Sequence, residues 1–231
     1  MSGSLLITAA IVGAIGNALH PHTVDTDVTA ANRAIAESGT WVWIHLAIVL
    51  AVLFLMGGLA GFAHVLEATA GSALARVANV ASLVGGTFVC ASTAIDGFGR
   101  KALATNWLAS PATSADAALQ SAIGTQLFGG ALWTFGMLIF FGLAFVAFGA
   151  ATSVSRRYPA WFGWAAIGSG AVSTAAATLR MVANGDEPVS ELLFLASSVT
   201  ITIWALVLGV MLWRGASEGA SANATLAGAT R

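Results

Sequence analysis

Long apolar stretches alternate with short polar connections along the whole chain. The clearest stretch runs from Trp41 to Phe62, and its only ionisable side chain is that of His45. About 20 consecutive apolar residues are enough for a helix that crosses a bilayer. The pattern therefore predicts a transmembrane helix that carries a histidine about one turn from its start.

The same pattern predicts six transmembrane helices, at about 4–20, 41–64, 74–96, 126–150, 160–182 and 190–213. We expect an all-α, polytopic membrane protein with a single six-helix domain over residues 1–214. Residues 215–231 are small and lack apolar periodicity, which predicts a disordered cytoplasmic tail. Between the first two spans, Asp27 is expected to cap a short helix that begins at Val28.

Composition supports a membrane location. The 231 residues are 58% hydrophobic and only 8% charged, against about 25% charged residues in soluble domains. The net charge of −1 provides no basic surface for nucleic acid. The lipid bilayer is therefore the expected partner, and a small polar ligand, an ion or an oligomer or complex partner is compatible with the sequence.

Basic residues predict the orientation. Arg156, Arg157 and Arg214 follow the fourth and sixth predicted spans, and arginine and lysine are enriched in cytoplasmic loops. Both termini are therefore expected in the cytoplasm. Alanine and glycine are abundant and arginine far outnumbers lysine, a bias typical of GC-rich bacterial genomes. We expect a multi-pass protein of the bacterial inner membrane.

This topology brings ionisable residues from five separate segments to the outer side of the membrane. They are His20, His45, Asp96, Arg180 and Glu191. A charge that faces lipid costs up to ~3 kcal/mol at mid-bilayer and less near the surface. We therefore expect these side chains to face inward and to pair with one another.

The leading interpretation of this layer is a pocket that binds, or binds and translocates, a small polar ligand or a proton. In that interpretation His45 is the titrating centre, and Asp96 and Arg180 form its electrostatic frame. The alternative is a purely structural role, in which an ion pair of Asp96 with Arg180 only orients helices, as in a structural subunit of a larger membrane complex.

A third interpretation is a membrane-embedded metal or haem protein. His20, His22 and His45 are the candidate ligands, and Asp25 or Asp96 adds a carboxylate. Such a set suits zinc, copper or non-haem iron, and His20 with His45 is the only pair for a haem. No HExxH, CxxC or P-loop motif is present, so the sequence leaves open whether the protein is an enzyme.

The fourth histidine does not belong to this layer. His64 lies 19 residues after His45, about 28 Å along a helix. It is expected to form a solvated pair with Glu67 near the inner surface.

Four short motifs resemble a group of small, uncharacterised six-helix membrane proteins of GC-rich bacteria. They are Ala18-Leu19-His20-Pro21, Trp43-x-His45, Ala94-Ile95-Asp96-Gly97 and Tyr158-Pro159-Ala160-Trp161. The resemblance implies the six-helix fold and the membrane location. It implies no activity. Its motifs include His20, His45 and Asp96, which the predicted topology also places at one depth in the membrane.

Overall fold

A computed structural model describes residues 1–20, 27–183 and 188–229, with side chains as far as residue 215. His22 and Asp25 lie outside the described residues. The described chain is helical, with no strand in these ranges, so the expected all-α class is confirmed.

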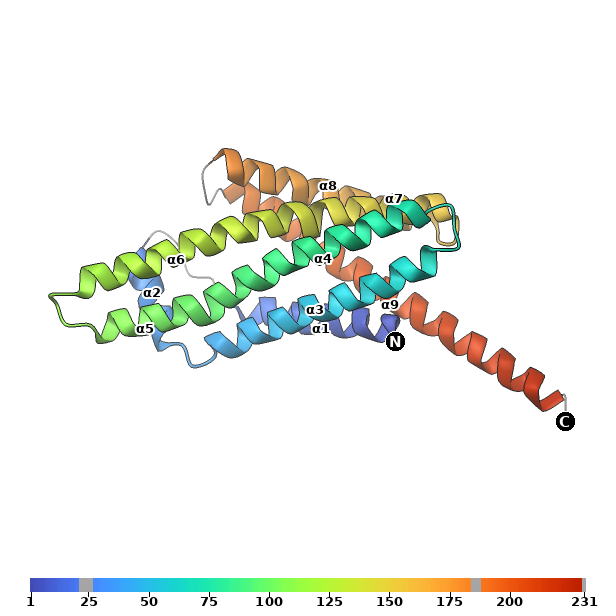
Figure 1. The fold of residues 1–231 in the computed structure, drawn as a ribbon, viewed down its shortest axis with the longest axis horizontal. Coiled ribbons are helices and arrows are strands. Elements are labelled where there is room, and N and C mark those ends of the chain that lie inside the picture. The colour runs from blue at the N-terminus through green and yellow to red at the C-terminus, as the bar shows by residue number, and fades with distance from the viewer. Residues whose placement is uncertain (21–26, 184–187, 230–231) are drawn as a thin grey trace.

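Six long helical rods and one short helix make up most of the described chain (Figure 1). The rods are α1 (Ser2–Leu19), α3 (Trp41–Leu66), α4–η1–α5 (Ser72–Ala94, Ile95–Arg100 and Lys101–Ala109), α6–η2–α7 (Ala115–Gly136, Met137–Ala144 and Phe145–Ser155), α8 (Ala160–Val182) and α9 (Pro188–Ala229). The short helix α2 (Val28–Glu37) lies between α1 and α3. The segments η1 and η2 are π-helical turns within their rods.

The rods are arranged as a closed ring in chain order. Each rod packs against the next, and α9 returns to pack against α1. The closing contact is close because Gly3 lies directly against the backbone of Gly209 and Trp213. An even number of antiparallel rods brings the start of α1 and the last apolar turns of α9 to the same end of the ring.

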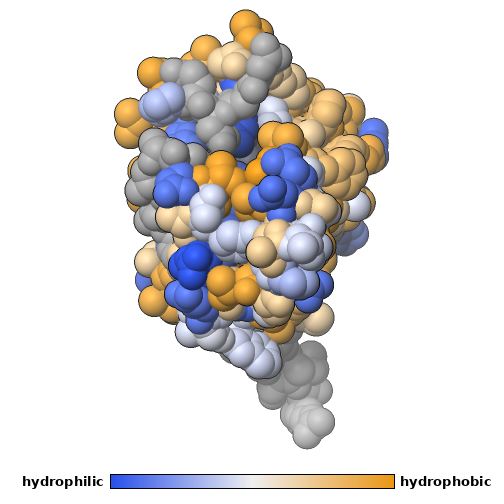
Figure 2. Space-filling view, turned by 90° about the vertical axis from the view of Figure 1, so that its left-hand side faces the viewer, coloured by the Kyte–Doolittle hydropathy of each residue, from blue (hydrophilic) through white to orange (hydrophobic). Residues whose placement is uncertain are grey.

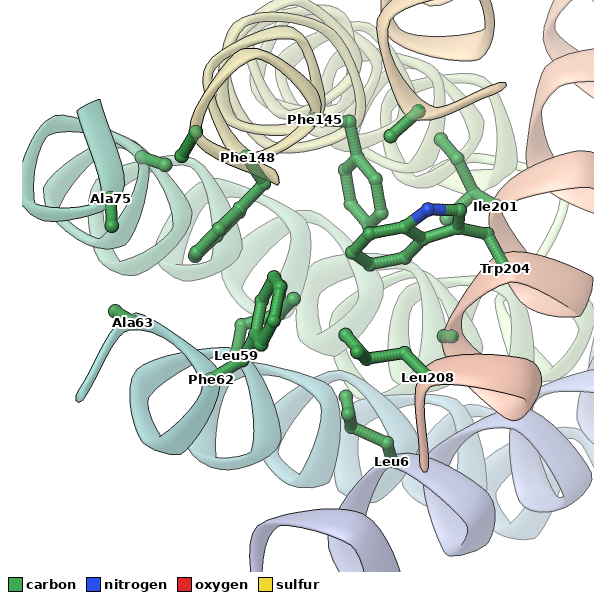
Figure 3. Close-up of a cluster of buried hydrophobic side chains, with 14 of the residues drawn as sticks. Leu6, Leu59, Phe62, Ala63, Ala75, Phe145, Phe148, Ile201, Trp204 and Leu208 are labelled. Carbon is green, nitrogen blue, oxygen red and sulfur yellow. The ribbon is translucent and has the colours of Figure 1, made fainter. Parts of the chain in front are cut away.

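Large aromatic side chains fill the interior of the ring (Figure 3). Phe62, Phe145, Phe148 and Trp204 come from α3, α7 and α9 and are almost completely buried. Trp204 also stacks on Phe162 with ring centroids 4.9 Å apart. Because lipid is as apolar as these side chains, their close packing rather than their removal from water holds the rods together.

Five of the six rods are long and apolar enough to cross a membrane, which makes this a multi-pass membrane protein. The exception among the described rods is α8, whose many glycine, serine and threonine residues lower its mean hydropathy. One hydroxyl of α8 bonds to α9, since Ser173 Oγ and Ser197 Oγ are 2.6 Å apart. The number of six spans therefore stays a prediction.

Three helices are longer than their predicted spans. Helix α9 continues to Ala229, beyond the predicted end near residue 213. The expected helix 74–96 belongs to an uninterrupted rod of 38 residues, Ser72–Ala109, and 126–150 belongs to one of 41 residues, Ala115–Ser155. The expected end at Asp96-Gly97 was wrong, because the chain makes a π-helical turn there and stays helical until the residue before Ser110-Pro111. At 1.5 Å per residue each of these two rods is ~60 Å long, about twice the hydrocarbon thickness of a bilayer.

The excess length of both rods forms a hairpin beside α2 at one end of the molecule (Figure 1). There the Lys101 ammonium donates to the carbonyls of Ile35, Ala36 and Ser38, each at 2.8 Å. At the other end of α2, Asp27 accepts hydrogen bonds from two backbone amides, which confirms the expected cap. Hydrophilic and hydrophobic residues are interspersed on this end of the molecule (Figure 2).

Candidate functional site

Three of the predicted residues meet where the membrane-spanning part of the ring joins this end of the molecule. His20 follows the last residue of α1, His45 lies in the second turn of α3, and Asp96 lies in the π-helical turn η1. π-helical turns are frequent at functional sites because their wider backbone re-aims side chains. The fold thus brings together residues that are 25 and 51 positions apart.

The three side chains converge through specific atoms. His45 Nε2 lies 3.2 Å from His20 Nε2 and 2.9 Å from Asp96 Oδ2. His20 Nε2 and the same carboxylate oxygen are 4.0 Å apart. The three atoms therefore form a small triangle, in which His45 Nε2 is the atom closest to the other two.

The contact of Nδ1 shows which ring nitrogen of neutral His45 carries the proton. His45 Nδ1 lies 2.7 Å from the backbone carbonyl oxygen of Trp41, and a carbonyl can only accept. Nδ1 therefore carries a proton, and in the neutral imidazole Nε2 presents a lone pair. That lone pair faces a carboxylate oxygen and a second imidazole nitrogen, so a proton or a cation is needed between them.

Packing fixes the position of the His45 ring. The ring is 2% exposed and lies 4.6 Å from the Trp41 ring, centroid to centroid. Trp41 Nε1 in turn donates to the backbone oxygen of Asp96 at 3.0 Å. Gly97 lies in η1, which packs against this part of α3. It has no side chain, and an added Cβ would lie only 2.4 Å from the Cβ of His45. The absence of a side chain at residue 97 allows α3 and η1 to approach this closely.

Arg100 is part of the site, and the sequence analysis missed it. Its Nη1 donates to Asp96 Oδ1 at 3.3 Å, and its side chain is 7% exposed. Residues four apart are neighbours on a helix, so the spacing of Asp96 and Arg100 was the available signal. It was overlooked because the helix was expected to end at Asp96. The Trp41 side chain is also part of the site and is buried.

The triangle has the composition of a metal site. Two histidines and one aspartate each offer one ligand atom, and these atoms lie within 4.8 Å of one another. His20 and Asp96 are 28% and 31% exposed, so one side of the triangle is open. Metal-binding histidines commonly donate their other N–H to a backbone carbonyl, and His45 does so.

The remaining predicted residues lie elsewhere. Arg180 lies in the last turn of α8, with its Nη2 near Gly130 of α6. Glu191 is exposed in the first turn of α9. In the described part of the chain, the ion pairs of Asp96 are with His20, His45 and Arg100.

His64 lies where the sequence analysis expected it. Its Nδ1 is 2.9 Å from Glu67 Oε2 at the last turn of α3. Both side chains are mostly exposed, so the predicted solvated pair is confirmed.

The fold and the site define a multi-pass helical membrane protein with a His–His–Asp cluster near one end of its helix ring. The chain belongs to the family described as a domain of unknown function, DUF4386, whose family model matches residues 1–215. The resemblance to an uncharacterised family is thereby confirmed. No curated protein and no solved structure matches the chain.

Proposed function

We propose that this protein binds a divalent transition-metal ion through His20 Nε2, His45 Nε2 and Asp96 Oδ2. The observation that carries the proposal is the pair of contacts at His45. Because Nδ1 donates to the Trp41 carbonyl, Nε2 is left as a ligand atom between two further ligand atoms. A proton on Nε2 can point well toward only one neighbour, whereas one metal ion serves all three atoms.

The separations suit a single ion. Ligand atoms bound at about 2.1 Å in tetrahedral geometry lie about 3.4 Å apart. The three separations here are 2.9, 3.2 and 4.0 Å, on both sides of that value. Two histidines with one carboxylate suit zinc or non-haem iron, and imidazole also suits copper.

Haem is a poorer fit. Two nitrogens on opposite faces of one haem iron would be about 4 Å apart, twice a metal–nitrogen bond of about 2.0 Å. The two Nε2 atoms are 3.2 Å apart, which leaves too little room for a porphyrin between them.

Three protein ligands among the described residues, with an open side, are typical of an exchangeable site rather than a structural one. Structural zinc sites have four protein ligands, whereas catalytic sites keep one position for water or substrate. Here the exposed edges of His20 and Asp96 leave such a position. The bundle therefore presents the ion as a Lewis acid to the aqueous side, which we place outside the cytoplasm because Arg156, Arg157 and Arg214 lie at the opposite end.

A second candidate is the binding of a proton or a small polar ligand at the same three residues. The 2.9 Å contact between His45 Nε2 and Asp96 Oδ2 favours it, because a protonated imidazole would donate well to a carboxylate. In this candidate the cluster holds a proton and no metal.

Metal content of the detergent-purified full-length protein distinguishes the two candidates. We expect close to one equivalent of zinc, iron or copper in the wild type, measured by elemental analysis after expression in medium containing all three. His20→Ala, His45→Ala and Asp96→Asn should each lower the content at least about tenfold. His64→Ala is the matched control, because this histidine is 79% exposed and lies far from the cluster.

Thermal unfolding of each variant shows whether it is folded. Folded wild-type protein that stays free of metal after incubation with each ion would refute the metal site and favour the proton-binding candidate. Equal metal content in the wild type and in all three cluster variants would place the ion elsewhere.

A further inference from the structure

Arg100 has donors that the cluster does not use. Its Nη1 donates to Asp96 Oδ1, but its Nε and Nη2 atoms are buried and have no hydrogen-bond partner among the described residues. A buried donor without a partner costs free energy, and a charged donor costs more than a neutral one. These two nitrogens are the unexplained polar atoms nearest to the cluster.

Nε and one Nη nitrogen together form a recognition edge. The guanidinium group is planar, and adjacent nitrogens present parallel N–H bonds that match two oxygens of a carboxylate or a phosphate. A lysine cannot form this arrangement, because its ammonium is a single point charge. The unused donors of Arg100 therefore define a ligand class, an oxyanion with two adjacent oxygens.

With a metal ion bound, the site has a net positive charge that an anion would balance. Asp96 and Arg100 cancel one another, and a divalent ion then adds two positive charges. The neighbouring Lys101 ammonium contacts only backbone carbonyls in the described chain, so it adds positive charge without compensation. Buried charges are found paired, and the protein groups described around the cluster do not supply the missing negative charge.

We infer that Arg100 Nε and Nη2 form an oxyanion subsite beside the metal, which binds a small ligand through a carboxylate or phosphate group. The inference rests on the proposed function, because the metal supplies the charge that the anion balances. Asp96 joins the two parts, since Oδ2 belongs to the metal triangle and Oδ1 accepts from Arg100. Binding of the anion should therefore alter the metal site.

Cobalt(II) is a suitable probe, because the visible spectrum of the ion responds to its ligands. The full-length protein is loaded with Co²⁺ in detergent and titrated separately with acetate and with inorganic phosphate. We expect a saturable spectral change, and the anion that binds more tightly identifies the source of the oxyanion. Arg100→Lys should raise its dissociation constant at least about tenfold.

Arg76→Lys is the matched control, because this exposed arginine lies near the start of α4 at the opposite end of the ring. It should bind the anion as the wild type does. Equal affinity in Arg100→Lys and wild type, or no saturable change in the loaded wild type, would overturn the subsite and leave the metal site standing.

Two further measurements cover the remaining outcomes. If Arg100→Lys does not fold, bromide replaces the variant, because a halide offers one acceptor atom and cannot match two parallel N–H bonds with two separate oxygens. An oxyanion that binds the wild type at least about tenfold more tightly than bromide supports the subsite, and equal affinities refute it. If the wild type binds neither cobalt nor zinc, iron or copper, the proposed function fails. Calorimetric titration of the metal-free protein with both anions then decides the subsite alone, with binding in support and its absence against.

Discussion

His45 uses its two ring nitrogens in different ways. Nδ1 is committed to a backbone carbonyl of its own helix, which leaves Nε2 to face the second histidine and the aspartate. The ring is held by Trp41 on one side and by the close approach of η1 on the other. A side chain held this firmly is preorganised, so binding of an ion requires little rearrangement at this ligand.

Gly97 is the residue that this preorganisation needs. In Gly97→Ala the new Cβ would lie 2.4 Å from the His45 Cβ and 2.8 Å from its Cγ. These atoms are close to the backbone of α3, so the two elements must move apart. We expect the metal affinity to fall at least about tenfold and the free energy of unfolding to fall by about 1–3 kcal/mol. Competition with a metal-binding dye and unfolding in detergent measure the two effects.

Gly99→Ala is the matched control for this substitution. It adds the same methyl group to the same π-helical turn, but the new Cβ would lie 3.7 Å from the Thr125 side chain, an ordinary contact. Its metal affinity should equal that of the wild type. Equal losses in both variants would show that any alanine disturbs η1, and the role assigned to Gly97 would be wrong.

The residues that could be predicted from the sequence are those whose burial in a membrane costs much free energy in any fold. An ionisable group inside a span is expensive, so His45 and Asp96 were identified without knowledge of the fold. Arg100 and Trp41 were missed because their roles depend on a helix that continues beyond Asp96. Ser92 donates to the Gly129 carbonyl of α6 at 2.8 Å, a contact that only the packing of two helices defines.

At the scale of elements, helix positions were predictable and helix ends were not. Apolar stretches of about 20 residues mark the part of a helix inside the membrane. A helix that continues into water is marked only by the absence of a strong breaker, and Gly97 was mistaken for one. The stop at Ser110-Pro111 was the better signal, because a proline disfavours helical backbone in the residue before it.

Lys101 explains how the ten-residue helix α2 is held at the end of the molecule that carries the His–His–Asp cluster. Short helices are marginal in water, and α2 is stabilised by Asp27 at its start and by the Lys101 ammonium at its last carbonyls. Cations are favourable at this end of a helix because its carbonyls carry partial negative charge. The chain's single lysine thus ties α2 to α5.

Lys101→Met should therefore loosen α2 without disturbing the membrane-spanning rods. The substitution keeps the length of the side chain and removes three charge-assisted hydrogen bonds. We expect the opening free energy of residues 28–37 to fall by about 2 kcal/mol, measured by hydrogen exchange of their backbone amides. Thr105→Ala is the control, because its exposed hydroxyl bonds only within α5. Unchanged exchange in Lys101→Met would contradict the role of the lysine.

At the scale of the whole molecule, glycine contacts allow the ring to close. Gly3 in α1 lies against Gly209 and Trp213 in α9, and an added Cβ would lie 2.5 Å from the Gly209 carbonyl oxygen and 2.8 Å from the Trp213 nitrogen. Both are backbone atoms and cannot rotate away. Small residues at such contacts allow transmembrane helices to approach closely.

Gly3→Ala should separate α1 from α9 and destabilise the whole bundle by about 1–3 kcal/mol. Unfolding in mixed detergent micelles measures this change. Gly13→Ala serves as the control, because its Cβ would lie 3.5 Å from the Ala51 methyl group, an ordinary contact between α1 and α3. If the two variants are equally stable, closure of the ring does not depend on Gly3.

The structure also removes an objection to the predicted orientation. Arg100 and Lys101 lie at the end expected outside the cell, where basic residues are disfavoured. Arg100 is buried against Asp96, and Lys101 donates to three helix carbonyls. Both charges therefore have specific structural roles in the folded protein. Arg156 and Arg157, by contrast, are exposed in the turn between α7 and α8 at the opposite end.

Labelling of single cysteines in intact cells tests this orientation. Cys90 is first replaced by alanine, and Thr113→Cys and Ala70→Cys are then introduced separately into exposed turns at opposite ends of the ring. A maleimide that cannot cross membranes should label residue 113 in intact cells and residue 70 only after permeabilisation. The reversed pattern would place the His–His–Asp cluster on the cytoplasmic side. The metal chemistry would be unchanged, but the ion would then be exposed to cytoplasmic rather than external ligands.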